Sequence, residues 1–432
     1  MRNTLYPNLA YKDGALTIGG VPATELATKY TTPIFVCDED KIRENCRVYK
    51  TALDTLCNGS CALYASKALS FVKIYDIVSS EGLGADVVSG GELYTALKSG
   101  IDKNMLYFHG NNKSDDELEY AVASGVGCIV ANDINEAKRI NSAAANAGTT
   151  QKTMLRVTPN IDPHTFKQVS TGQLDSKFGT TIETGEAMDA VKYIESAKNL
   201  DFCGCHCHIG SQIFSVQPFF DALEVMLSFY SELAQNGIKC RELDIGGGIG
   251  VRYTDEDKAP DIGTSVRRIV KKLISLCEDK KIDRPRLILE PGRSIVGDAG
   301  VTLYTAGSIK DIHGVRTYIS VDGGMTDNPR YALYQAVHTA VKASNCGTES
   351  TINATVAGKT CESGDIVAEN VLIERPKTGD LIAVLTTGAY CYSMASNYNR
   401  LPRPAVVMIK DKKTYLAVRR ETYEDIVQND II

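Results

Sequence analysis

The chain has 432 residues, of which 43% are hydrophobic and 23% are charged, values that are ordinary for globular proteins. At this length two or three domains are expected. The net charge of −6 argues against nucleic acid or an anionic membrane as the main partner, because both favour basic surfaces. No apolar run reaches the roughly 20 residues that span a bilayer, and the first residues do not read as a secretion signal.

The chain contains 13 cysteines, an odd number at irregular spacing. A secreted disulfide framework usually shows an even number at regular positions, whereas reduced thiols are ordinary in the cytoplasm. We therefore expect a cytoplasmic protein with free thiols.

The middle of the chain alternates short apolar runs with longer amphipathic stretches. Eight apolar runs are predicted as strands: Ala62–Ala65, Ala85–Val88, Met105–Phe108, Cys128–Val130, Met154–Val157, Phe202–Ile209, Glu242–Ile245 and Leu287–Glu290. Helices are predicted between them, among them Gly91–Lys98, Asp115–Ala123, Glu136–Ala147, Pro218–Gln235 and Val266–Glu278. Ser114 with Glu117 suits a capping box, and Gly125 suits a helix end. Eight strands alternating with helices over about 250 residues predict a (β/α)₈ barrel.

Polar residues recur at or just after the predicted strand ends: Lys67, Asp86, His109, Arg156, His208, Gly246–Gly248 and Glu290. In a barrel the carboxyl ends of the strands converge on one face, which carries the active site. An open doubly wound sheet, which is the alternative, would spread these residues along a line. Their recurrence favours the barrel.

The pattern changes after Gly297. Five segments there are β-like: Thr317–Val321, Ile352–Ala357, Leu381–Leu385, Ala405–Ile409 and Thr414–Val418. Helical periodicity is confined to a stretch near Tyr331–Ala343, and the first residues add the β-like pieces Ala15–Ile18 and Pro33–Val36. We expect residues 1–36 to join a β domain, residues 37–297 to form the barrel, and residues 298–432 to form the C-terminal all-β domain.

Lys67 follows the first predicted barrel strand. A lysine at that position would point into a water-poor pocket, where desolvation makes its free amine available for a Schiff base. For a lysine taken alone, a surface side chain is the more ordinary interpretation, so the surrounding motifs decide.

Glycines follow two late strands, in Asp244–Gly250 and Glu290–Arg293, and Ser211 follows a third. Glycines after strands let backbone N–H groups approach an anion, and late barrel strands commonly form a phosphate site. A dinucleotide fingerprint fits Gly246–Gly250 poorly because the full glycine spacing is missing. Tight turns without a ligand are the remaining interpretation.

The segment Cys203–His208 alternates cysteine with glycine and histidine, which invites comparison with a metal site. Alternate residues of a strand face opposite sides, so this segment cannot gather all its ligands on one ion. It also lacks the usual two-residue gap between cysteines. We predict no metal, cysteines that fill the core, and His208 alone at the functional end.

Taken together, these motifs resemble the fold-type III pyridoxal-phosphate (PLP) decarboxylases, and most closely the diaminopimelate decarboxylase family. The resemblance covers nearly the whole chain and rests, in family order, on YASKA, GADVVSGGEL, HIGSQ, DIGGGIG, EPGRSIVG, DGGMTDNPRYALY, CESGD and GAYCYSMASNYNRLPRP. It implies a PLP-binding barrel with an alanine-racemase-like β domain. The reaction implied is decarboxylation of meso-2,6-diaminopimelate to L-lysine and CO₂, the last step of the diaminopimelate route of lysine biosynthesis.

Residue by residue, the resemblance implies that Lys67 forms the Schiff base and that Glu290 pairs with the protonated pyridine nitrogen, which makes the ring an electron sink. His208 would stack on that ring. The phosphate would be held by Ser211, Gly248, Gly292 and Arg293. Asp86 and Arg156 would support these groups, and Tyr390 would contact both cofactor and substrate.

For the substrate, the family implies that Arg293, Arg330 and Tyr334 recognise carboxylate, which suits the arginine fork. Cys361 of a partner subunit would return a proton to the α-carbon as general acid, and Glu362 would hold the distal ammonium group. The protein would then be a homodimer with shared active sites.

Three alternatives stay open. An ornithine, arginine or carboxynorspermidine decarboxylase would keep the chemistry and change the substrate. A catalytically dead relative is disfavoured because Lys67 and Cys361 are both present, and a racemase fits CESGD and EPGR poorly. Two departures from the family pattern, Tyr331 after Arg330 and the Ala405-Val406 pair, affect only local loop shape.

Overall fold

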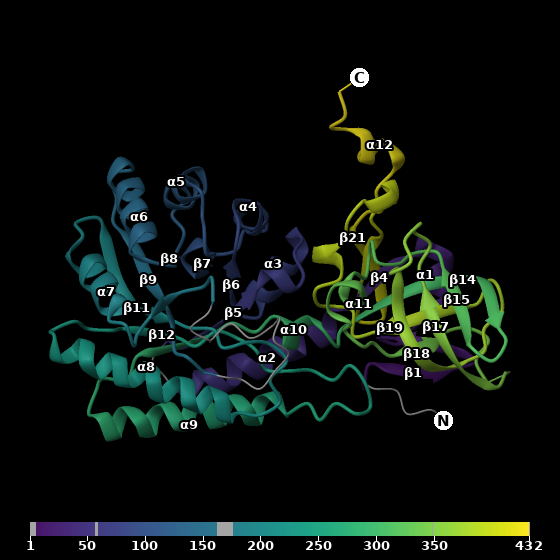
Figure 1. Cartoon of the computed structure of the whole chain (residues 1–432), viewed down its shortest axis with the longest axis horizontal. Helices are drawn as coiled ribbons and strands as arrows, with labels where there is room; N and C mark the ends of the chain where they lie inside the picture. The colour runs from purple at the N-terminus through teal and green to yellow at the C-terminus, as the bar shows by residue number, and fades with distance from the viewer. Residues whose placement is uncertain (1–5, 57–58, 162–175, 348, 432) are drawn as a thin grey trace. The chain divides into compact units, whose positions relative to one another are not determined.

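The computed structural model describes residues 6–56, 59–161, 176–347 and 349–431. Two compact units are distinguished, and Figure 1 shows their elements. The β unit comprises Met1–Glu44, Val251–Lys258 and Ile295–Ile432, and the barrel unit comprises Asn45–Gly250 and Ala259–Ser294. Residues 37–44, 251–258 and 295–297, which we expected in the barrel, thus fall in the β unit. Within the described ranges, no helix has both the length and the apolar character needed to cross a bilayer.

Eight parallel strands of the barrel unit close on themselves. β8 pairs with β9, and β13 pairs with β5, so the order β5–β6–β7–β8–β9–β11–β12–β13 returns to its start. The predicted barrel is confirmed, and the open-sheet alternative is wrong because an open sheet leaves two edges unpaired. The strands are β5 (Cys61–Ala65), β6 (Gly84–Val87), β7 (Leu106–Phe108), β8 (Cys128–Ala131), β9 (Gln151–Thr158), β11 (Leu200–His206), β12 (Glu242–Asp244) and β13 (Arg286–Leu289). A short strand, β10 (Thr180–Thr181), pairs with β9.

Helices surround these strands, as Figure 1 shows. Their apolar faces cover the outside of the barrel, which explains why the strands read as continuous apolar runs. The helices are α2 (Glu39–Asp54), α3 (Val72–Ser80), α4 (Gly90–Lys98), α5 (Asp115–Ser124), α6 (Ile134–Asn146), α7 (Glu186–Ser196), α8 (Gln217–Gln235), α9 (Ile262–Lys280) and α10 (Arg293–Val296). The predicted capping box of Ser114 and Glu117 begins α5, and Gly125 ends it with φ +70°.

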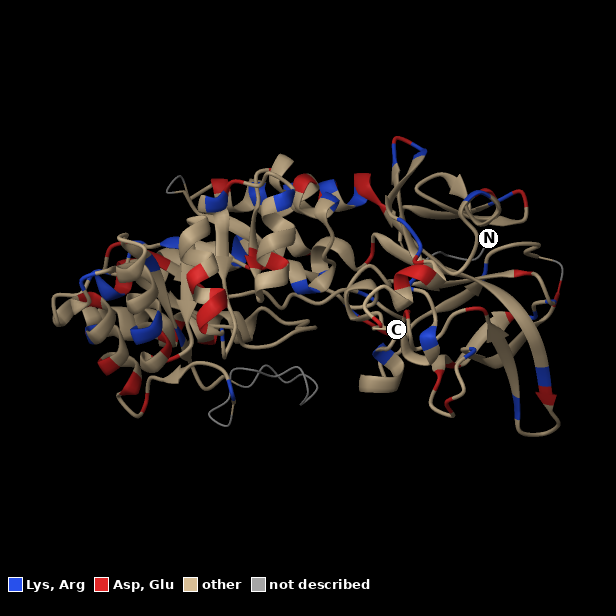
Figure 2. Ribbon diagram, turned by 90° about the horizontal axis from the view of Figure 1, so that it is seen from above, with Lys and Arg blue, Asp and Glu red and all other residues tan. Residues whose placement is uncertain are grey.

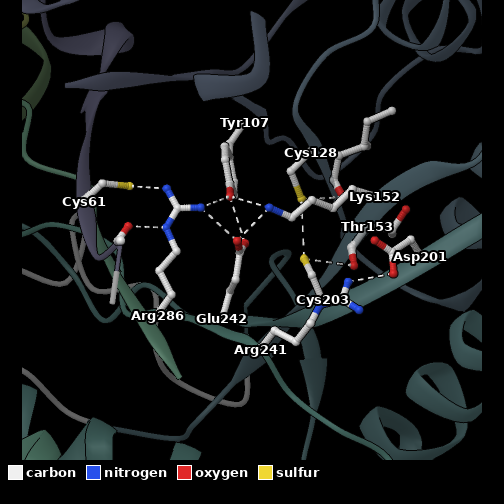
Figure 3. Close-up of polar contacts among 12 residues, drawn as sticks. Cys61, Tyr107, Cys128, Lys152, Thr153, Asp201, Cys203, Arg241, Glu242 and Arg286 are labelled. Carbon is white, nitrogen blue, oxygen red and sulfur yellow. Dashed lines mark hydrogen bonds and ion pairs between the residues drawn. The ribbon is translucent and has the colours of Figure 1, made fainter. Parts of the chain in front are cut away.

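The amino-terminal end of the barrel is closed by a network of charged groups, drawn in Figure 3. The Glu242 carboxylate accepts hydrogen bonds from Lys152 Nζ at 2.7 Å, Arg286 Nη1 at 2.9 Å and the Tyr107 hydroxyl at 2.8 Å. Burial opposes ionisation of Glu242, but Lys152 and Arg286 outweigh it and lower the pKa of this carboxyl. The carboxylate therefore stays charged and fully bonded, which is the condition under which a buried ion pair is tolerated.

The β unit is built around one large sheet with the order β18–β17–β15–β14–β4–β20–β21, to which β19 and β16 attach. β4 pairs antiparallel with β14 and parallel with β20, so the amino-terminal segment is an interior strand of the C-terminal sheet. A separate sheet contains β1, β2 and β3. The strands are β1 (Leu9–Lys12), β2 (Ala15–Ile18), β3 (Val21–Pro22), β4 (Ile34–Asp38), β14 (Gly300–Ile312), β15 (Arg316–Val321), β16 (Ala340–Lys342), β17 (Thr351–Ala357), β18 (Ile366–Glu374), β19 (Leu381–Leu385), β20 (Ala405–Lys410) and β21 (Lys413–Val418).

Helices in the β unit are short: α1 (Ala23–Tyr30), α11 (Arg330–Tyr334) and α12 (Tyr423–Val427). The helix expected near Tyr331–Ala343 is wrong beyond its first turn. Gln335 adopts φ +53° and ends α11, and residues 340–342 become β16 because they pair with β19. Figure 2 shows acidic and basic residues interspersed over both units.

Candidate active site

The carboxyl ends of the barrel strands bring several predicted site residues together. Lys67 lies in the one-turn helix Ser66–Ala68 directly after β5, and Asp86 lies in the neighbouring strand β6. Lys67 Nζ is 3.7 Å from Asp86 Oδ2. The Lys67 side chain is 41% exposed, whereas the Asp86 side chain is buried. The expectation of a water-poor pocket around Lys67 is therefore not met, because the lysine stands just past the strand rather than inside the barrel.

Glu290 follows β13 and is 4% exposed. Two imidazoles hold its carboxylate: His109 Nε2 lies 2.8 Å from Oε1, and His206 Nε2 lies 3.3 Å from Oε2. The sequence predicted that His208 alone of this segment lies at the functional end. This prediction is wrong, because β11 directs His206 into the barrel, where it meets the ends of β7 and β13. The strand predicted at Phe202–Ile209 offered a signal, since alternation along it would put His206 and His208 on one face.

Two more buried carboxyls lie in this region, and their electrostatics differ from those of Glu290. Burial raises the pKa of Asp244 well above its ordinary value, and the Glu290 carboxylate adds to the shift. Burial also raises the pKa of Asp86, against the opposing influence of His109 and Lys67. For Glu290, burial is outweighed by His109 and His206, which hold its pKa well below the usual range. Of the three carboxyls, Glu290 is thus the one whose pKa is lowered.

His109, His206 and Glu290 also meet a geometric requirement for a metal centre. One ligand atom from each lies within 4.8 Å of the others. Two imidazoles and one carboxylate form a donor set that several divalent metals accept. We predicted no metal for the Cys203–His208 segment, and that prediction stays a prediction.

Three loops of the barrel unit, which follow β11, β12 and β13, are joined by hydrogen bonds. The Ser211 hydroxyl accepts hydrogen bonds from Arg293 Nε at 3.2 Å and Nη2 at 3.0 Å. The Ile213 N–H donates to the carbonyl of Gly248 at 2.9 Å, and the Gly250 N–H donates back to the carbonyl of Ile213 at 3.0 Å. Ser211, Gly248 and Arg293, predicted to hold a phosphate, therefore lie in one connected set of loops.

Glycine is required at the close approach of these loops. A Cβ on Gly247 would lie 2.0 Å from the Glu290 carbonyl oxygen, and one on Gly248 would lie 2.4 Å from that of Gly210. Gly248 also has φ +122°, which side chains rarely adopt. The glycines leave backbone groups accessible in this region, and such an arrangement suits an anion. Glu290 retains lone pairs beyond the two imidazoles, which suits a further N–H donor. These residues fit the phosphate and the ring nitrogen of PLP.

His208 contacts the glycine loop that follows β12. Its Nδ1 accepts a hydrogen bond from the Gly247 N–H at 3.3 Å, which places the proton of a neutral ring on Nε2. Burial lowers the pKa of His208 well below its ordinary value, and the nearby Lys67 cation adds to the shift. Arg156, in β9, is buried and stacks over the Phe178 ring at 4.2 Å. A neutral imidazole at His208 suits stacking on an aromatic ring.

The remaining predicted residues lie in the β unit. Arg330 is buried at the start of α11, where its Nη1 donates to the Tyr253 hydroxyl at 2.7 Å, while Tyr334 in the same helix is 45% exposed. Cys361 and Glu362 are both exposed, and the Cys361 N–H donates to Asn399 Oδ1 at 2.8 Å. Tyr390 is partly buried and has φ +60°.

Comparisons with known proteins agree along the whole chain. Residues 39–297 match the pyridoxal-binding domain of the pyridoxal-dependent decarboxylases. The diaminopimelate decarboxylase of Bacillus subtilis (strain 168) is 43% identical over 419 residues, covering 97% of this chain and 95% of the relative.

Two solved structures are similar in both units. Diaminopimelate decarboxylase from M. jannaschii, in complex with L-lysine, superposes with a TM-score of 0.93 at 34% identity and covers 99% of this chain and 98% of its own. That of Helicobacter pylori, also with L-lysine, has a TM-score of 0.86 at 31% identity, covering 94% and 98%. The chain therefore belongs to the diaminopimelate decarboxylase family of PLP-dependent enzymes.

Proposed function

We propose that this protein decarboxylates meso-2,6-diaminopimelate to L-lysine and CO₂, completing the diaminopimelate route of lysine biosynthesis. The observation that carries the proposal is the likeness to diaminopimelate decarboxylases, which extends through both units. The L-lysine bound in two solved relatives is the product expected from this reaction.

The barrel unit supplies the groups that hold PLP. Lys67 provides the amine for covalent attachment, and Asp86 keeps that lysine oriented through the 3.7 Å contact. Ser211, Gly248, Gly292 and Arg293 bind the phosphate, and His208 stacks on the ring with support from Arg156. When bound, PLP withdraws electrons from the bond to the departing carboxylate. Glu290 supplies the negative charge that keeps the ring nitrogen protonated.

The β unit supplies the groups that recognise substrate. Arg330 and Tyr334, with Arg293, bind carboxylate, and Tyr390 contacts cofactor and substrate. Cys361 of a second copy delivers a proton to the α-carbon, and Glu362 binds the ammonium group at the distal end. The exposure of Cys361 and Glu362 supports this arrangement, since groups that serve a neighbouring copy must lie at the surface. The proposal thus requires a homodimer with shared sites.

The state of the cysteines supports a proposal for the cellular compartment. All 12 described cysteines are free thiols, and nine of them are buried. Free thiols in this number are ordinary in a reducing compartment. We therefore place the enzyme in the cytoplasm.

The test is product analysis of the PLP-loaded protein incubated separately with meso-diaminopimelate, L-ornithine and L-arginine. We expect lysine and CO₂ from the first substrate and at least about a hundredfold less turnover of the others, because a site built for paired charges rejects ligands that leave them unpaired. Efficient turnover of ornithine or arginine would contradict the proposed substrate while leaving the barrel chemistry intact.

Arg330→Lys sharpens the same test. A lysine keeps the charge but loses the bidentate fork, so KM for diaminopimelate should rise if Arg330 binds a carboxylate. Arg375→Lys is the matched control, because Arg375 lies in the same unit and pairs with Asp311 at the surface. An unchanged KM in the Arg330 variant would remove this residue from the substrate site.

A further inference from the structure

The two imidazoles around Glu290 form a cluster that the assigned roles do not use. His109 and His206 come from the ends of different strands, β7 and β11, and both are buried. Their rings meet edge to face, with centroids 4.7 Å apart and an interplanar angle of 70°. Each presents Nε2 to a different oxygen of one carboxylate, at 2.8 and 3.3 Å. His206 is within hydrogen-bond distance of one oxygen, and His109 makes a close ion-pair contact with the other.

His206 is a neutral hydrogen-bond donor in this cluster. Burial lowers the pKa of His206 to about 3, although the Glu290 carboxylate opposes the shift. A neutral imidazole carries one proton, and the carboxylate can only accept, so that proton lies on Nε2. The other nitrogen, Nδ1, has no hydrogen-bond partner among the described residues. His206 is thus oriented by Glu290 and not by a second partner.

Comparison with the neighbouring carboxyls shows what the imidazoles do. Glu290, Asp86 and Asp244 are all buried at the same end of the barrel. Burial raises the pKa of Asp86 and Asp244, whereas the pKa of Glu290 is lowered. Glu290 differs from the other two in having an imidazole close to each of its oxygens.

We propose that His109 and His206 are positioning residues for the decarboxylation, which fix the direction of the Glu290 carboxylate so that it sustains the protonated ring nitrogen of PLP. This inference rests on the proposed function, because it requires that Glu290 faces the ring nitrogen. It adds that Glu290 does not act alone. Without the two imidazoles, burial would raise the pKa of this carboxyl as it raises that of Asp244, and a neutral carboxyl no longer favours a protonated ring.

The experiment compares His206→Leu with His206→Gln, together with the same two changes at His109. Leucine removes the donor, whereas the Gln side-chain amide places an N–H close to the position of Nε2. Each protein is loaded with PLP carrying ¹⁵N in the ring, and the ¹⁵N chemical shift is measured against pH. This signal reports directly whether the ring nitrogen is protonated. Tyr107→Phe, at the other end of the barrel, is the matched control for a buried substitution.

We expect the leucine variants to show an unprotonated ring nitrogen at neutral pH and a kcat lower by about ten- to a hundredfold, the usual cost of losing a supporting hydrogen bond. The glutamine variants should recover the wild-type signal and most of kcat, and the Tyr107 variant should match wild type. A protonated ring nitrogen in His206→Leu and His109→Leu overturns the inference. If His206→Leu does not fold, His206→Asn, which is too short to reach Glu290, takes its place.

Glu290→Gln separates this inference from the proposed function. Loss of the protonated signal in Glu290→Gln, but not in the leucine variants, rejects the role of the histidines and keeps that of Glu290. Retention of the signal in Glu290→Gln rejects the ring-nitrogen contact itself, and the inference falls with it.

Discussion

The two ends of the barrel each hold a buried glutamate with two basic partners, but the partners differ. At the amino-terminal end Glu242 is bound by Lys152 and Arg286, which carry permanent charges at neutral pH, and by the Tyr107 hydroxyl. At the carboxyl-terminal end Glu290 is held by two imidazoles. The first set neutralises its carboxylate within the protein. The second leaves the Glu290 carboxylate able to accept a hydrogen bond from a further N–H donor, as the proposed ring-nitrogen contact requires.

Because of this difference, we expect the amino-terminal network to contribute mainly to stability and the carboxyl-terminal cluster mainly to function. A fully paired network closes one end of the barrel and leaves little binding capacity, as Figure 3 illustrates. An incompletely paired carboxylate is costly in the ligand-free protein and becomes favourable only when a partner binds. The barrel thus carries its structural charges at one end and its chemical charges at the other.

Removing one lysine from each end of the barrel tests whether the two ends serve activity and stability separately. Lys67→Met should abolish covalent attachment of PLP and lower kcat by at least about 10³-fold, since the attacking amine is gone. Because the Lys67 side chain is 41% exposed, the melting temperature should hardly change.

Lys152→Met should do the reverse. It removes the 2.7 Å contact to Glu242 and should cost about 2 kcal/mol of stability, with kcat unchanged in the folded protein. Enzyme assay, the absorbance of bound PLP and thermal unfolding measure both variants. A Lys152 variant that is stable but inactive would show that the two ends are coupled.

The pH dependence of stability should also distinguish the ends. The pKa of His206 is lowered from 6.5 to about 3. Its contribution to the free energy of unfolding is therefore complete above pH 6.5 and is lost as the pH falls toward 3. The pKa of Glu242 is lowered from 4.5, so its contribution is complete above pH 4.5 and is lost only below it. Between pH 6.5 and 5, protonation of His206 on unfolding should lower the free energy of unfolding of wild type by about 2 kcal/mol. This loss should be absent in His206→Gln, because glutamine does not titrate.

Thermal unfolding of wild type, His206→Gln and Lys152→Met across pH 4–7 measures this. Lys152→Met should parallel wild type above pH 5 and diverge below pH 4.5. Parallel curves for wild type and His206→Gln would contradict a neutral, buried His206.

The smallest effect is expected from Tyr107→Phe. The hydroxyl donates to Glu242 at 2.8 Å and accepts from Lys152 Nζ at 3.0 Å, so its loss removes one neutral donor from a network that keeps both cations. We expect about 1 kcal/mol of destabilisation and no change in kcat or PLP affinity. Thermal unfolding and PLP titration check this, and a weaker affinity for PLP would mean that the network reaches the active site.

Regular periodicity made most of the fold predictable. All eight barrel strands were located to within a few residues, because each is a short apolar run bounded by turn residues. The helices α2, α3 and α7 and the long strands β14 and β18 were not among the segments named from the sequence. These strands alternate little or are polar over part of their length, since their outer residues face solvent, and a local pattern then gives no signal.

The site residues likewise fall into those that the sequence indicated and those that only the structure brought together. Lys67, Glu290 and the glycine loops follow strand ends or belong to motifs, so the sequence by itself determined them, along with the barrel and the family. Only the tertiary structure decided that His206 meets Glu290 and His109, that Glu242 draws Lys152 and Arg286 together, and that β4 enters the C-terminal sheet. The reason is physical: these contacts join residues far apart in the chain, and they depend on barrel closure and strand register, which no local periodicity encodes.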